Sequence, residues 1–192
     1  MKTRHYIIVA ILSLNQCDSK NPFREEIDLK NREQTVQMEL QRKKILEMKQ
    51  VGCKLSPHII SKEDAIQNFL IELQKTPTAN LKTLTSNDED LGCIFPHTVG
   101  FGTALDFTPI LEYQNLMQQR REMGLRTIRE KIQNHPFKIK ALSWEKPRNY
   151  NGIYGHKPSS LVISSNGKNH YLSEIKMVFE VNGTFKVGVL GN

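Results

Sequence analysis

The change of hydrophobic period at Pro136 constrains the fold of this chain more than any other feature of its sequence. Before Pro136, apolar residues recur at the spacing of amphipathic helices, most clearly over residues 61–75 and 108–133. After it, apolar and polar residues alternate, which is typical of strands with one buried face. Helices that precede strands predict an α+β fold, in which the helices pack on one face of an antiparallel sheet.

Three Asn-Gly pairs separate the predicted strands of the second half. Asn-Gly tolerates the positive φ angles of a tight hairpin turn, so these pairs favour a four-stranded antiparallel meander. The pairs lie at residues 151–152, 166–167 and 182–183. The four predicted strands cover residues 137–144, 161–163, 175–181 and 185–189.

The first half predicts three longer helices and two short turns of helix. They cover residues 33–50, 61–75 and 108–133, with the short turns at 80–84 and 88–91. Ser61 is a natural N-cap for the second helix, and Asp64 follows three residues later as in a capping box. Thr108 and Pro109 predict the start of the third, because proline is well tolerated at the first helical position.

The N-terminus has the layout of a secretory signal, with a basic start, an apolar stretch over residues 6–14 and polar residues after it. Cys17 follows the apolar stretch, with Leu14 three residues before it, and in this respect the segment resembles the signal of bacterial lipoproteins. Asn15 and Gln16 stand where most such signals carry small residues, a looser pattern that resembles the lipoproteins of spirochaetes. The resemblance implies cleavage before Cys17, acylation of its thiol and a membrane anchor.

This interpretation divides the chain into a signal peptide (1–16), a flexible tether (17–32) and one domain (33–192) with its core over about 61–190. The anchored protein would lie in the cell envelope, at the outer membrane, where it would face either the periplasm or the outside. The membrane would be one of its partners, bound through the N-terminal lipid. A plain secretory signal, or a buried segment with an incidental cysteine, is the alternative. No apolar run approaches the ~20 residues of a membrane-spanning helix.

The order of the predicted elements resembles the nuclear-transport-factor-like or cystatin-like α+β roll, and more narrowly that of uncharacterised small bacterial lipoproteins. The matching pieces are a helix (65–73), an acidic turn (86–90), a long helix (110–132) and a closing hairpin (179–189). The resemblance implies a cavity between helices and sheet that often holds a ligand. Fold alone does not determine function, so the ligand or protein partner stays open.

The net charge and the two remaining cysteines restrict the possible functions less than the N-terminal segment and the order of the elements do. The formal net charge of +7 fits an ordinary solvated surface, and no nucleic-acid partner is expected. Cys53 and Cys93 either pair as a disulfide in an oxidising compartment or pack as two buried thiols. The cysteine and histidine spacings do not suit zinc, and we predict no metal and no cofactor.

Asp106 and His97 are the candidate catalytic residues, because enzymes with this kind of roll use an Asp–His pair inside the cavity. Both lie near the glycine-containing loop 98–107. The alternative is that Asp106 is a loop aspartate that caps the next helix and that His97 is an exposed loop histidine. His156 and His170 could approach each other across a hairpin, but two histidines without a third ligand make a poor metal site.

A hairpin rich in aromatic and basic residues is a further candidate surface. Its rings could stack on bases or sugars, or the segment could be an ordinary amphipathic hairpin. The residues are Trp144, Lys146, Arg148, Tyr150, Tyr154, His156 and Lys157.

Three hypotheses of function follow. The first is a non-enzymatic envelope lipoprotein that binds a ligand or partner through its cavity or hairpin. The second is a small hydrolase or isomerase that uses Asp106 with a histidine, and an Asp–His pair lining the cavity would favour it. The third is a surface adhesin or inhibitor, which an exposed apolar patch on the sheet would favour.

Overall fold

The computed structural model describes residues 22–76, 81–132 and 135–191. The expected signal peptide (1–16) and the predicted lipidation site Cys17 lie outside the described residues. The chain divides into two compact units, residues 1–36 and 37–192, and the second holds all the described strands. Within the described ranges, no helix has both the length and the apolar character needed to cross a membrane.

Helix α1 (Pro22–Glu47) begins earlier than the sequence pattern predicts. Residues 22–32, which we expected to be irregular, are helical, since no glycine or further proline interrupts them. Near the end of α1, Gln41 Nε2 donates to the Thr108 carbonyl (3.1 Å) and Gln41 Oε1 accepts from the Ile110 N–H (2.7 Å). This side chain thereby caps the start of the long helix that follows.

Two of the predicted helices are confirmed, α2 (Lys62–Lys75) and α5 (Ile110–Ile132). Ser61 caps α2 as expected, because its Oγ accepts a hydrogen bond from the Asp64 N–H at 3.0 Å. Helix α2 buries an apolar face along its whole length, whereas the buried residues of α5 begin at Gly124. The first half of α5 therefore stays partly open.

Short helical segments connect α2 to α5. They are α3 (Asn87–Glu89), the π-helical turn η1 (Asp90–Ile94), α4 (Phe95–Thr98) and the 3₁₀ turn η2 (Ala104–Asp106). Ser86 begins the run with a capping box, in which its Oγ accepts from the Glu89 N–H (3.2 Å) and Glu89 accepts from the Ser86 N–H (2.8 Å). The helical run extends beyond the short turn predicted at 88–91, because Pro96 lies in the first turn of α4, where its missing N–H is tolerated.

The second half is antiparallel, as predicted, but the described residues hold seven strands rather than four. The strands are β1 (Phe137–Trp144), β2 (Arg148–Tyr150), β3 (Ile153–His156), β4 (Pro158–Ser165), β5 (Lys168–Tyr171), β6 (Ile175–Val181) and β7 (Thr184–Leu190). They form a sheet of order β1-β4-β5 and a sheet of order β2-β3-β6-β7. The α+β class is confirmed and the four-strand count was wrong.

The Asn-Gly turns explain the correct order and the wrong count together. In all three pairs the asparagine has a φ of 50° and the glycine a positive φ, as tight hairpin turns require. Each turn joins neighbouring antiparallel segments, so the meander order is kept. Breaks near residues 145–147, 157 and 172–174 split three of those segments, and bulges in β1 and β6 add to the bending. Twisted ribbons can turn from one sheet into the other at such points.

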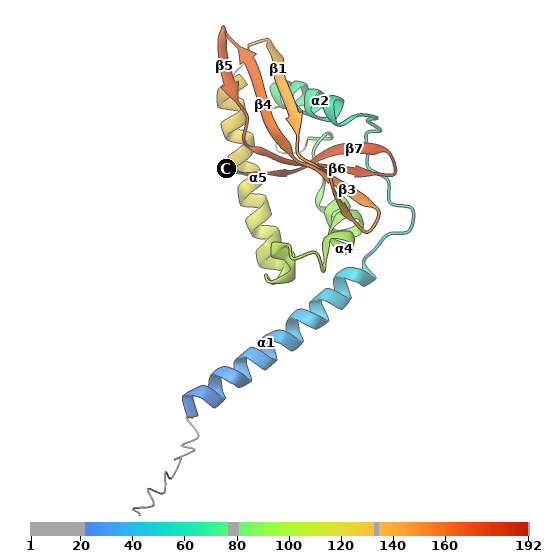
Figure 1. The fold of residues 1–192 in the computed structure, drawn as a ribbon, viewed down its shortest axis with the longest axis vertical. Helices are drawn as coiled ribbons and strands as arrows, with labels where there is room; N and C mark the ends of the chain where they lie inside the picture. The colour runs from blue at the N-terminus through green and yellow to red at the C-terminus, as the bar shows by residue number, and fades with distance from the viewer. Residues whose placement is uncertain (1–21, 77–80, 133–134, 192) are drawn as a thin grey trace, which may run out of the picture. The chain divides into compact units, whose positions relative to one another are not determined.

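Two hydrophobic cores lie within residues 37–192. The sheet core packs α2 and the second half of α5 against β4, β6 and β7. The disulfide core packs the end of α1, η1 and α4 against β2, β3 and β6. In Figure 1, α5 runs along one side of the strands and α4 lies near β3.

Candidate functional site

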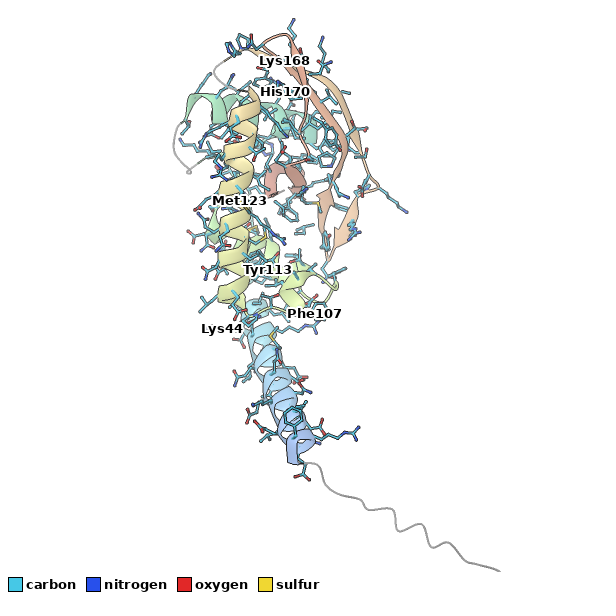
Figure 2. All side chains as sticks on the ribbon, turned by 90° about the vertical axis from the view of Figure 1, so that its left-hand side faces the viewer. Lys44, Phe107, Tyr113, Met123, Lys168 and His170 are labelled. Carbon is cyan, nitrogen blue, oxygen red and sulfur yellow. A yellow bond between two sulfur atoms is a disulfide. The ribbon has the colours of Figure 1, made fainter. Side chains whose placement is uncertain are left out.

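A cleft of about 870 Å³ lies between α5 and the segment 81–89, and Lys186 of β7 contributes to its wall. This α5 cleft has the size of a small-molecule site, for which ~300–1,000 Å³ is usual. Its apolar lining consists of Pro57, Leu81, Leu84 and Leu125. The part of α5 that lines the cleft surrounds Met123, which Figure 2 labels on that helix.

A buried ion pair lies in one wall of the α5 cleft. Lys186 is only 3% exposed, and its ammonium donates to both Glu89 carboxylate oxygens (2.9 and 2.8 Å) and to the Ser56 carbonyl. Glu89 also accepts from the backbone N–H groups of Ser56 (3.2 Å) and Ser86 (2.8 Å). Because every charge is paired and hydrogen-bonded, this wall is electrostatically satisfied without a ligand.

A second ion pair joins α5 to η1. Arg121 Nη2 donates to Asp90 Oδ2 at 3.0 Å, and the two side chains are 13% and 11% exposed. Burial raises the pKa of Asp90 to about 6, although the Arg121 charge partly offsets this effect. Arg121 lines the α5 cleft and also an adjoining cavity of about 280 Å³ that Asp90 lines. The guanidinium therefore lies between the cleft and the buried carboxylate.

Asp90 also borders a cavity of about 140 Å³ inside the disulfide core. Tyr113 and Phe179 are among the residues that line it, and Figure 2 labels Tyr113 near the start of α5. Burial raises the pKa of the Tyr113 hydroxyl, and the nearby Asp90 charge adds to the shift. A small, mostly apolar cavity thus shares Asp90 with the cavity of about 280 Å³ that adjoins the α5 cleft.

Cys53 and Cys93 form a disulfide, with a Cα–Cα distance of 5.6 Å. Cys93 belongs to the same π-helical turn as Asp90, and Cys53 follows the end of α1. The bond therefore links the segment that carries the acidic side of the site to the chain after α1. The sequence alone left a disulfide and two free thiols open.

The structure does not bring Asp106 and His97 together. Asp106 accepts hydrogen bonds from the backbone N–H groups of Gly100 (2.6 Å) and Thr103 (3.0 Å), which holds its own loop. His97 Nδ1 lies 2.8 Å from the Asn151 carbonyl oxygen. Asp106 therefore orders its own loop, where we expected it to cap the next helix. His97 is not an exposed loop residue but a half-buried residue of α4, and its partner lies 54 residues away in the chain.

The other histidines are also separated. His156 is buried at the end of β3, where its Nε2 lies 2.8 Å from Glu180 Oε2. His170 lies on β5 in the other sheet, and Figure 2 labels it beside Lys168. The expected approach of His156 and His170 across a hairpin was therefore wrong. Among residues 22–76, 81–132 and 135–191, no three His, Cys, Asp or Glu side chains are placed to hold a metal ion.

The aromatic and basic hairpin does not form one exposed platform. Tyr150 is buried and makes an edge contact with Phe101, at 5.3 Å between ring centroids. Trp144 donates to Glu63 (2.8 Å), and the Lys62 ammonium lies 4.9 Å from its ring centroid. Only Tyr154, at 39% exposed, offers a large open ring face. The interpretation as an ordinary amphipathic hairpin agrees better with these contacts.

Four site residues were missed at the sequence level, namely Glu89, Asp90, Arg121 and Lys186. The capping-box spacing from Ser86 to Glu89 was the one signal that could have marked the acidic side. Nothing in the alternation of β7 indicates that Lys186 is buried. Searches against known protein families, curated proteins and solved structures found no match.

Proposed function

We propose that this chain is a lipid-anchored protein of a bacterial cell envelope whose domain binds a small ligand in the α5 cleft without transforming it. The observation that carries the binding part is the cleft itself, with a volume of about 870 Å³ and one apolar side. The anchoring part rests on the sequence around Cys17. The membrane is then one partner and the ligand the other.

The internal bonding of the cleft supports a preformed binding site. Glu89 and Lys186 are tied to each other and to backbone groups, so the wall does not need to reorganise before a ligand enters. The disulfide between Cys53 and Cys93 restrains the neighbouring turn. Preorganisation of this kind lowers the cost of binding.

Binding is favoured over catalysis because Asp106 and the histidines, the candidates for an Asp–His pair, do not line this cleft. Asp106 and His97 make separate hydrogen bonds, to Gly100 and to Asn151. His156 and Glu180 form a histidine–carboxylate pair, but neither residue lines the α5 cleft. A general base must reach the proton that it removes, and no such pair faces this cavity in the described residues.

Filling the cleft mouth tests the binding proposal. Gln118 lines the cleft and Gln119 does not, although both are exposed on α5. We expect native mass spectrometry to detect a small-molecule adduct on the wild-type protein and on Gln119→Trp, both purified from the membrane fraction. Gln118→Trp should lack the adduct, because the indole occupies the mouth. Equal adducts on both variants, or none on the wild type, would contradict binding in this cleft.

Metabolic labelling with a fatty acid tests the anchor. The wild-type chain should incorporate the label and Cys17→Ala should not, because the proposed acyl chains attach at that thiol. Cys53→Ala serves as the matched control and should label like the wild type. Equal incorporation in Cys17→Ala would remove the anchor from the proposal.

A further inference from the structure

The carboxylates that line the α5 cleft accept hydrogen bonds from other groups of the protein. Glu89 accepts hydrogen bonds from Lys186 and from the backbone of Ser56 and Ser86. Glu122, on α5, accepts from Gln118 Nε2 at 2.7 Å. A cationic ligand would have to displace the donors of Glu89, whose charge Lys186 neutralises, whereas Glu122 keeps its negative charge in the cleft lining.

The cationic groups keep unused donors. Nη2 of Arg121 donates to Asp90 and, at 3.5 Å, to Thr85. The other nitrogens of Arg121 have no hydrogen-bond partner among the described residues. Lys82 is exposed at the rim, and its ammonium forms no ion pair in the described part of the chain. It does lie near Glu72, but the Glu72 carboxylate is occupied by hydrogen bonds from the backbone of Lys82 and from Thr83. The unused donors that Arg121 and Lys82 keep in the cleft therefore carry positive charge.

We infer, on the basis of the ligand binding proposed above, that the ligand of the α5 cleft is an amphiphilic anion, with its charged head at Arg121 and Lys82. Its apolar body lies against Leu81, Leu84 and Pro57, which line the same cavity. Arginine is well suited to this role, because its planar fork can bind a carboxylate, sulfonate or phosphate through two parallel N–H groups. Short acyl and alkyl anions have this chemistry.

The bound anion and Asp90 would share the guanidinium of Arg121, so binding of the anion is coupled to protonation of Asp90. An anion at Arg121 competes with Asp90 for the same charge and adds its own negative charge nearby. Burial already raises the pKa of Asp90 to about 6, so the bound anion favours its protonated form further. The charged or titratable groups around Asp90 are Arg121 and Tyr113 of α5 and the adjacent Glu89, which Lys186 of β7 neutralises. Binding is therefore expected to take up a proton and to strengthen as the pH falls through about 6.

Calorimetric titration of the full chain carrying Cys17→Ala tests the inference with three probes of equal length. Hexanesulfonate is anionic, hexanamide neutral and hexylammonium cationic, and none of them changes charge between about pH 5.5 and about pH 8. We expect hexanesulfonate to bind roughly tenfold more tightly than hexanamide, and hexylammonium to bind most weakly. The affinity for hexanesulfonate should fall severalfold from about pH 5.5 to about pH 8.

Variants test where the charged head of the ligand binds and which residue takes up the proton. Arg121→Gln should weaken hexanesulfonate binding roughly tenfold, and Lys82→Gln by a smaller factor. Arg126→Gln, an exposed arginine of α5 outside the cleft lining, should leave it unchanged. Asp90→Asn should bind with little pH dependence. Far-UV circular dichroism checks that Arg121→Gln is folded, and Lys82→Gln tests the same head group from the exposed rim.

The outcomes separate this inference from the proposed function. If hexanamide or hexylammonium binds as tightly as hexanesulfonate while the Gln118→Trp and Gln119→Trp adducts differ as expected, the cleft binds ligands and the anionic class is wrong. If Arg126→Gln weakens binding as much as Arg121→Gln, the head is not at Arg121. If no probe binds, the inference is overturned, and the adduct experiment decides the proposed function by itself.

Discussion

The sheet core and the disulfide core of the same domain are held together in different ways. Phe69, Ile128 and Ile163 of the sheet core are 0% exposed and interlock between two helices and the strands. The disulfide core encloses a cavity of about 140 Å³ and relies on the Cys53–Cys93 bond beside the buried carboxylate of Asp90. Close packing stabilises the first region, whereas a covalent link stabilises the second, beside a carboxylate whose burial costs more than its ion pair with Arg121 returns. The two regions differ in how they are held together and not in which of them borders the α5 cleft alone, because Leu81, Leu84 and Leu125 of the cleft lining belong to the sheet core.

The largest expected effect compares one phenylalanine from each core. Phe69→Ala should cost about 4 kcal/mol of unfolding free energy, because it leaves a void in a fully packed region. Phe95→Ala, beside the existing cavity, should cost about 2 kcal/mol, because fewer contacts are lost there. Urea unfolding followed by far-UV circular dichroism measures both. Equal losses would show that the two cores are packed alike.

Removal of the disulfide should have the next largest effect. The double variant Cys53→Ser, Cys93→Ser is expected to lose about 3 kcal/mol of unfolding free energy, since its loop is no longer closed in the unfolded chain. Hydrogen exchange should rise in residues 86–98 and stay slow in α2. A reductant should destabilise the wild type and leave the double variant unaffected. Uniformly faster exchange in both regions would break the distinction between the cores.

Asp90 predicts a pH dependence confined to the disulfide side. Its pKa is raised from 3.8 to about 6, so the folded protein holds this proton more tightly than the unfolded chain. The resulting stability is complete below about pH 4 and is lost as the pH rises through about 6, by on the order of 3 kcal/mol. Urea midpoints between these pH values should vary less in Asp90→Asn than in the wild type. The exposed neighbour Asp88, changed to Asn, is the control and should keep the wild-type profile.

The smallest expected effect compares two helix caps. Ser61→Ala removes the cap of α2, and Ser86→Ala removes the cap beside the cleft, each at about 1 kcal/mol. Ser61→Ala should lower the thermal midpoint of the whole domain. Ser86→Ala should also speed hydrogen exchange at Glu89 and Asp90, since the capping box orders that wall. The comparison would lose its meaning if Ser61→Ala loosened the cleft wall as much as Ser86→Ala.

Local patterns were sufficient for much of the fold. The spacing of Ala65, Phe69 and Leu73 marked α2, and the Ser61 cap marked its first residue, because both signals act within a few residues. The Asn-Gly pairs marked every hairpin turn for the same reason. The breaks inside the predicted strands carried no comparable signal, since the twist of neighbouring strands sets where a ribbon bends.

The site was much less accessible from the sequence. Asp106 and His97 were chosen because their residue types and loop suited catalysis, and the structure gives them separate partners, in the loop of Asp106 and at Asn151. Arg121 looked like one arginine among several on an exposed helix face. Its role comes from Asp90, which lies 31 residues away in the chain and 3.0 Å away in space. A pair of this kind exists only after two helices have packed.

The sequence by itself determined that helices precede an antiparallel meander, where each turn lies and how α2 begins, because hydrophobic period, caps and Asn-Gly turns depend on near neighbours. The expectation of an acylated Cys17 also comes from the sequence alone and awaits the labelling experiment. Only the tertiary structure decided that the strands form two sheets, that Lys186 is buried against Glu89, and that Arg121 stands between Asp90 and an open cleft. Those features depend on desolvation and on contacts between residues distant in the chain, which no short stretch of sequence encodes.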